Sequence, residues 1–201
     1  ALLAADPTGL VYVHYDAKAA PSEFERLRAA LADAPRVVLL ERRAASGWGQ
    51  FGLVQACLNA FDAAFTRDDP PDFFHLMSAS CAPIHPIAAF RAFLAERRDQ
   101  AFIECEGPEW IVGGLREERY TLYHLFNERA HREAFYWFVQ IQRLFRIRRR
   151  VPIPVAPRFG SQWWTLPRDF VIRLREEIGR NPALLPFFRK VWIPDEMFFQ
   201  T

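Results

Sequence analysis

Short apolar runs separated by amphipathic stretches dominate the first hundred residues of this 201-residue chain. Residues 10–15 are β-branched and aromatic and are followed by Asp16, which predicts a buried strand. A proline then opens an amphipathic stretch at Pro21, and this is typical of a first helical turn. We expect further strands at 37–40, 73–77 and 101–104, and further helices at 53–65 and 86–97. This alternation predicts an α/β fold with a mainly parallel central sheet flanked by helices.

The pattern changes in the second half of the chain. Residues 117–150 are aromatic and rich in arginine, and we expect them to be helical in pieces. Three prolines between 152 and 157 interrupt that stretch and predict an extended connector. Residues 159–166 then read as a strand or turn, and 167–178 as a helix.

Composition sets the class of protein. The length predicts one domain, and 51% hydrophobic with 25% charged residues excludes a disordered chain. No run approaches 18 apolar residues, and we expect neither a membrane-spanning helix nor a signal peptide. A net charge of +2 is too small to argue for a nucleic-acid partner. The three cysteines fit no zinc pattern, so we expect isolated reduced cysteines in the core: Cys57, Cys81 and Cys105.

Candidate ligand-binding residues follow the predicted strands, because open α/β sheets bind ligands at the carboxyl ends of their strands. Asp16 could accept hydrogen bonds from ribose or a base, or it could cap a turn. For His14, inside an apolar run, a satisfied core histidine outweighs a catalytic one. Trp48 between two glycines could stack on a planar group or anchor its loop. The small-residue loop at 78–83 is a further candidate.

Several kinds of site are absent from the sequence. It has no Walker loop, no His-Glu-x-x-His and no Gly-x-Ser-x-Gly. Glu196 is the most suggestive acid, because a proline precedes it and aromatic residues flank it, which suits a general base. An N-terminal helix acid is the equally open alternative. The arginine-rich run 143–150 reads as a solvated helix end or as a site for phosphate or an anionic surface.

Five segments, in this order, resemble glycosyltransferase family 14. They are Val-Tyr-Val-His-Tyr-Asp-Ala-Lys from Val11, Gly-Trp-Gly from Gly47, His-Leu-Met-Ser-Ala-Ser-Cys-Ala-Pro-Ile from His75, Gly-Ser-Gln-Trp-Trp-Thr-Leu-Pro-Arg from Gly160 and Pro-Asp-Glu-Met-Phe-Phe-Gln-Thr from Pro194. That family contains core-2/I-branching β-1,6-N-acetylglucosaminyltransferases and peptide O-xylosyltransferases. The arginine-rich insert before Gly160 resembles bacterial members.

The resemblance implies a GT-A-type fold, a UDP-sugar donor and inversion at the anomeric carbon without a metal ion or other cofactor. The absence of an Asp-x-Asp pair agrees with that expectation. The resemblance also implies roles for individual residues. Glu196 is the catalytic base; the donor and nucleotide residues are His14, Asp16, Lys18, Trp48 and Gln162; the residues near the donor or acceptor sugar are Ser161, Trp163, Ser78 and Asp195.

The chain also departs from the family pattern. Relatives extend beyond both ends, so we expect residues 1–201 to be a single catalytic domain truncated at both ends. A later Arg/Lys pair that contacts the diphosphate has no counterpart here, and Arg158 or Arg168 are the substitutes to consider. Ala79 replaces the glycine of the family's Ser-Gly-x-x-x-Pro loop.

The expected function is therefore transfer of N-acetylglucosamine or xylose from a UDP-sugar to a hydroxyl of a glycan or protein. A catalytically inactive UDP- or carbohydrate-binding module of the same fold is the main alternative. Binding to nucleic acid or a membrane surface through 143–150 is a third reading, and it predicts affinity that falls steeply with salt. We expect no nucleic-acid partner. Peripheral association with a membrane is a possible partner interaction, and a bacterial member is expected to be cytoplasmic.

Overall fold

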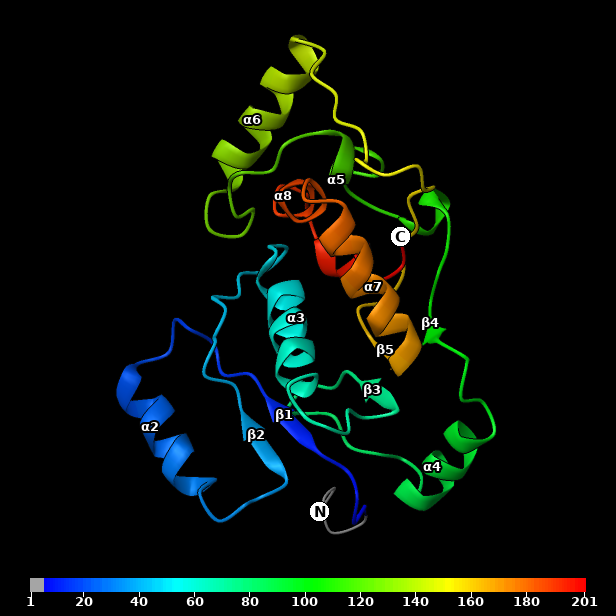
Figure 1. Ribbon diagram of the computed structural model, residues 1–201. Helices are drawn as coiled ribbons and strands as arrows, with labels where there is room; N and C mark the ends of the chain where they lie inside the picture. The colour runs from blue at the N-terminus through cyan, green and yellow to red at the C-terminus, as the bar shows by residue number, and fades with distance from the viewer. Residues whose placement is uncertain (1–5) are drawn as a thin grey trace. The chain divides into compact units, whose positions relative to one another are not determined.

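A computed structural model describes residues 6–201 of the chain. They form two compact units, each assembled from segments that are distant in the sequence. Unit 1 takes in 6–45, 56–102 and 165–171, and unit 2 takes in 46–55, 103–164 and 172–201. Figure 1 shows the order of helices and strands along the chain.

Unit 1 begins with a strand–helix–strand motif. Strand β1 (Val11–Val13) pairs in parallel with β2 (Val37–Leu39), and Val11 lies opposite Val37. Helix α2 (Pro21–Ala30) connects them. Its proline stands in the first turn, with Glu23 also there and Arg28 in the last turn, so its charges complement the helix dipole. The two predicted strands and the helix are confirmed, but β1, which the sequence predicts to be buried, is half-buried.

The second sheet of the described chain has the order β3-β5-β4. Strand β3 (Phe73–His75) pairs antiparallel with β5 (Trp164–Pro167), and His75 lies opposite Thr165. Strand β4 (Phe102–Ile103) has two residues. The predicted strands therefore fall into two small sheets, and the structure does not show the single, mainly parallel sheet expected from the sequence. The reason is that β5, which comes from the second half of the chain, is the partner of β3.

Helices α3 (Gly52–Ala64), α4 (Ile87–Ala95) and α7 (Arg168–Arg180) lie where the apolar spacing predicts helices. Residues 117–150 contain α5 (Glu118–Thr121) and α6 (Arg132–Leu144), so helical pieces are confirmed there. The proline-rich stretch after them carries no regular element, as expected of a connector. The remaining helical segments are η1 (Pro108–Trp110), α8 (Leu184–Phe188) and η2 (Pro194–Glu196).

Aromatic rings form much of the core of unit 2. Phe198 packs edge-on against Phe51, Phe188 and Phe199, with ring centroids 6.1, 4.9 and 5.1 Å away. Trp192 lies in a second cluster with Leu115, Leu122, Phe135 and Val139. The segment on either side of η2 is therefore part of the core. Between Asp6 and Thr201, no helix has the length and apolar character needed to cross a membrane.

The prediction about the cysteines is partly wrong. All three are free, but only Cys57 is buried, whereas Cys81 and Cys105 are exposed. The sequence around Cys81 and Cys105 lacks the apolar periodicity that places Cys57 on the inner side of α3.

Candidate functional site

Glu196 is the last residue of the short helix η2, and the backbone on both sides fixes its place. Ile193 enters η2 in the left-handed region, with φ +54°, and its amide donates to the Gly49 carbonyl at 3.0 Å. The Gly160 amide donates to the Glu196 carbonyl at 3.1 Å. A side chain at Gly160 would place its Cβ 2.2 Å from the Glu104 carbonyl oxygen, so this close approach requires glycine.

The Glu196 carboxylate forms an ion pair with Arg119 of α5. Arg119 Nη1 donates to Glu196 Oε2 at 2.7 Å, and the side chains are 9% exposed for Arg119 and 29% for Glu196. The carboxylate thus keeps access to solvent on one side while a buried guanidinium holds it on the other. Charge-assisted contacts of this kind are short and directional, so they orient the carboxylate.

Arg119 is itself fixed by three other contacts. Its Nε donates to the Leu115 carbonyl at 3.0 Å, and its guanidinium lies over the Trp192 ring at 5.3 Å. The Trp192 amide donates to the Arg119 carbonyl at 2.9 Å. The guanidinium therefore has little freedom to turn away from Glu196.

Asp195 stands beside Glu196 and is more deeply enclosed. Burial raises the pKa of Asp195 to about 6, and the neighbouring Glu196 carboxylate adds to that rise, although a backbone hydrogen bond and Arg119 oppose it. Within residues 6–201 nothing hydrogen-bonds its Oδ1 atom, which is buried. Asp195, which is costly to ionise, therefore lies next to Glu196, which Arg119 orients.

The loop that carries Trp48 lies in the same unit. The Trp48 ring meets the edge of Trp192 at 5.9 Å, and Arg129 stacks over it at 4.3 Å. Asn127 Nδ2 donates to the Trp48 carbonyl at 3.1 Å. Gly49 takes a φ of +66°, and a Cβ there would be 3.2 Å from Trp192 Nε1. The ring is nevertheless partly exposed, so both roles considered for Trp48 remain compatible with its position.

The segment 160–163 is also held by hydrogen bonds to its backbone. The Ser161 amide donates to Glu104 Oε2 at 2.7 Å, and the Ser161 carbonyl accepts from Gln200 Nε2 at 2.8 Å. Gln162 is half-buried and Trp163 is exposed. Unit 2 thus contains six of the predicted site residues: Trp48, Ser161, Gln162, Trp163, Asp195 and Glu196.

The other four predicted site residues belong to unit 1: His14, Asp16, Lys18 and Ser78. The Ala44 amide donates to His14 Nε2 at 2.9 Å, and burial lowers the pKa of His14. His14 therefore has a hydrogen-bond partner within unit 1, which is the structural role that the sequence analysis favoured for it. The Lys18 amide donates to Asp16 Oδ1 at 2.8 Å, so Asp16 caps a tight turn.

Ser78 lies in an exposed loop of unit 1. Its Oγ atom is 2.9 Å from Ser80 Oγ and 3.2 Å from Cys81 Sγ. These hydrogen bonds from Ser78 lower the pKa of the Cys81 thiol. The Ser78 hydroxyl thus forms its hydrogen bonds within the loop, to Ser80 and Cys81.

The two arginines considered as phosphate ligands have different surroundings. Arg168 binds the turn at 69–72: its Nε donates to the Pro71 carbonyl at 3.1 Å, and its Nη2 contacts Asp72 Oδ1 at 3.0 Å and the Pro70 carbonyl. Those contacts give Arg168 a structural role. Arg158 is exposed, and its amide donates to Thr201 Oγ1 at 3.1 Å.

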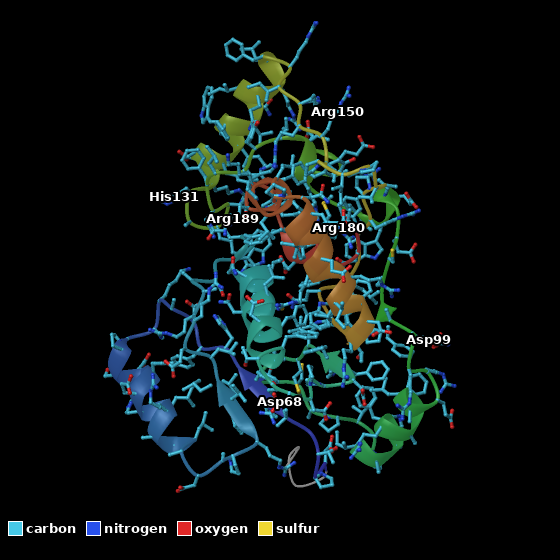
Figure 2. All side chains as sticks on the ribbon, viewed as in Figure 1. Asp68, Asp99, His131, Arg150, Arg180 and Arg189 are labelled. Atoms are coloured by element: carbon cyan, nitrogen blue, oxygen red, sulfur yellow. The ribbon has the colours of Figure 1, made fainter. Side chains whose placement is uncertain are left out.

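A basic cavity of about 250 Å³ lies beside the Trp48 loop within unit 2. Gly49, Gln50, His124, Arg189 and Lys190 are among the residues that line it, and Arg189 follows α8 (Figure 2). Burial lowers the pKa of His124 to about 4, so this histidine is neutral near pH 7. Its Nε2 is 2.8 Å from the Glu118 carbonyl.

Sequence reasoning missed Arg119, His124 and this basic cavity. Arg119 is 77 positions from Glu196, and nothing in its neighbourhood distinguishes it from the other arginines. A second cavity of about 580 Å³, lined by both acidic and basic side chains of 117–121 and 148–157, contains none of the predicted site residues.

The arginine-rich run 143–150 is not simply a solvated helix end. Arg149 is buried, and its guanidinium donates to the carbonyls of Leu122, Phe187 and Lys190 at 2.9, 2.5 and 2.9 Å. Arg143 forms a two-pronged ion pair with Glu118 at 2.8 and 2.5 Å. Only part of the run therefore faces solvent.

Within 6–201, no group of three or more His, Cys, Asp or Glu side chains is placed to hold a metal ion. In comparisons with known proteins, a family model described as Branch, Core-2/I-Branching enzyme, matches residues 2–201. A search of curated proteins finds no match.

Proposed function

The chain belongs to the core-2/I-branching enzyme family of glycosyltransferases, which implies a nucleotide-sugar donor and a glycan acceptor, and from this premise we propose that it is an inverting, metal-independent transferase with Glu196 as its general base. The family match over 2–201 carries the reaction class. The ion pair between Glu196 and Arg119 supports the assignment of the base, because it orients a partly exposed carboxylate. The proposal includes a GT-A-type fold, for which the β1–α2–β2 motif and family membership are the support.

In the proposed reaction, Glu196 accepts the proton of an acceptor hydroxyl as that oxygen attacks C1 of the donor sugar. The new bond forms between the acceptor oxygen and C1, the bond from C1 to the UDP oxygen breaks on the opposite face, and UDP leaves with the bonding electrons. A single displacement inverts C1 and requires one base. General-base catalysis of this kind contributes about 10²–10⁴-fold.

Negative charge grows on the leaving UDP and must be stabilised. We assign this role to Arg189 and Lys190, because both line the basic cavity beside the Trp48 loop. Arginine forks and lysine ammonium groups both bind phosphate oxygens well. Asp16, Lys18, His14 and Gln162 remain proposed donor ligands, and Ser161, Trp163, Ser78 and Asp195 remain proposed sugar contacts. N-acetylglucosamine and xylose are the donor sugars to compare.

The decisive experiment measures UDP release from a panel of UDP-sugars, with and without EDTA, beside UDP-induced thermal shift. We expect Glu196→Gln to lower turnover about 10²–10⁴-fold and to leave the thermal shift with UDP nearly unchanged. Glu133→Gln, an exposed acid in the first turn of α6, is the matched control and should behave like wild type.

Two outcomes would contradict the proposal. Turnover that EDTA abolishes and added cation restores is incompatible with a metal-independent reaction. A thermal shift with UDP but no turnover with any donor would instead indicate the inactive binding module.

A further inference from the structure

Helix α6 carries two apolar faces, and only one of them is covered. Phe135 and Val139 are buried in the cluster that contains Trp192. On other sides of the same helix and the turn after it, Trp137, Leu144 and Phe145 are 70, 77 and 71% exposed. With Ile141, which is also exposed, they repeat at helical spacing. Large contiguous apolar groups on a surface mark an interaction site.

Basic side chains surround the C-terminal end of this exposed face, whereas Glu133 stands one turn before Trp137 and Glu118 pairs with Arg143. No acidic residue occurs between Glu133 and Asp169. Arg146, Arg148 and Arg150 are exposed in the segment that follows α6. Arg150 lies beside the C-terminal end of that helix (Figure 2). Together with Trp137, Ile141, Leu144 and Phe145 they form what we call the α6 patch. A surface with this pattern attracts an anionic partner.

Arg146 occupies a backbone position that normally favours glycine. Its φ is +54°, and the Ile147 amide donates to the Gln142 carbonyl at 2.9 Å, which is the pattern of a helix end closed by a left-handed residue. A side chain in this conformation costs about 1–2 kcal/mol. The exposed Arg146 guanidinium adds its charge at the C-terminal end of the helix, next to Leu144 and Phe145.

We propose that the α6 patch docks onto the surface of a lipid bilayer that contains anionic lipid. Tryptophan prefers the interface between water and lipid, leucine and phenylalanine enter the acyl boundary, and arginine contacts the headgroups. The 13-residue helix Arg132–Leu144 would lie in the plane of the interface. A second copy of the chain fits less well, because a two-fold axis would bring identical arginines together. This proposal does not depend on the proposed catalytic function.

The apolar part of the patch is tested by vesicle flotation of the full chain. Vesicles of phosphatidylcholine are compared with vesicles that also contain phosphatidylglycerol. We expect binding to the anionic vesicles alone, and we expect the triple variant Trp137→Ser, Leu144→Ser, Phe145→Ser to lose it by at least about tenfold. The matched control Ile84→Ser, Val112→Ser changes two almost fully exposed apolar residues elsewhere and should bind like wild type.

The charged part is tested with Arg146→Gln, Arg148→Gln, which should weaken the partition onto anionic vesicles about thirtyfold at low salt. The control Arg26→Gln, Arg98→Gln removes the same charge from unit 1 and should have little effect. Melting temperatures of all variants should match wild type, because every substituted side chain is exposed.

Three results would overturn the proposal. One is the absence of binding to either vesicle. Another is an equal loss in the patch variants and their controls. The last is a dimer seen by light scattering without vesicles that the serine variant dissociates, because the α6 patch would then bind a second copy.

Discussion

At the scale of residues, the pairing of Arg119 with Glu196 defines the candidate site. The carboxylate alone could rotate in solvent, whereas the contact at 2.7 Å holds it, and Trp192 and the Leu115 carbonyl hold the arginine in turn. Under the proposed function, Arg119 is a positioning residue, because it would act on the reaction through the orientation of Glu196. A base displaced by about 1 Å can lose about 10² in rate.

We therefore expect Arg119→Met to lower kcat about ten- to a hundredfold with little change in KM for the donor. Steady-state kinetics with the best UDP-sugar measure both constants, and circular dichroism checks that the variant is folded. The exposed Arg116 provides a matched control, and Arg116→Met should leave kcat unchanged. A rise in KM at constant kcat would show that Arg119 binds substrate instead of orienting the base.

The sequence could point to Glu196 but not to its partner. Glu196 stands in a distinctive segment after a proline, whereas Arg119 is one of 26 basic residues in the chain. The pairing of β3 with β5 is hidden for the same reason, since His75 and Thr165 are 90 positions apart. Local patterns predict helices such as α2 and α3 well, because a first-turn proline and apolar spacing act within a few residues. Contacts between distant segments depend on the packing of the entire chain.

At the scale of elements, Arg149 connects the turn after α6 to α5 and α8. Its guanidinium donates to three backbone carbonyls and lies over the rings of Tyr123 and Phe187, at 4.8 and 4.2 Å. Burial lowers the pKa of Arg149 to about 10, so it remains charged near neutrality. Composition suggests a solvated run of arginines, and only the fold reveals that one of them is buried.

Replacing Arg149 with methionine should destabilise the protein by about 3 kcal/mol, because three buried carbonyls lose their donor. Arg149→Lys should restore little of this, since an ammonium group cannot match the fork geometry. Urea denaturation followed by circular dichroism measures the change. The neighbouring exposed residue supplies the control, and Arg150→Met should shift the midpoint very little. Equal effects at 149 and 150 would contradict the bridging role.

At the scale of the molecule, two buried groups in unit 2 set opposite trends of stability with pH. The folded-state pKa of Asp195 is raised to about 6, so its protonation as the pH falls from 6 towards 4 favours the folded state. The folded-state pKa of His124 is lowered to about 4, so acidification below about 6.5 favours the unfolded state. Each contribution is about 3 kcal/mol, and the two largely cancel.

Single variants should separate the two trends. Asp195→Asn should be more stable than wild type near pH 7 and lose stability as the pH falls to about 4. His124→Phe, which keeps a ring against Phe135, should gain stability over the same range. Free energies of unfolding from urea titrations at several pH values test both. Parallel pH profiles for the two variants would rule out this assignment of the titrating groups.

The burial of the residues after Glu196 has a practical consequence. Met197, Phe198, Phe199 and Gln200 are all buried, so the segment that carries the proposed base is also core of unit 2. That segment has little chance to detach while the remainder of unit 2 stays intact. Amide hydrogen exchange at 195–200 should accordingly be among the slowest in the protein. Under the proposed function, the specific activity of a purified sample would then be proportional to the fraction of molecules that are folded. Partial unfolding would lower that fraction without changing kcat or KM of the folded enzyme.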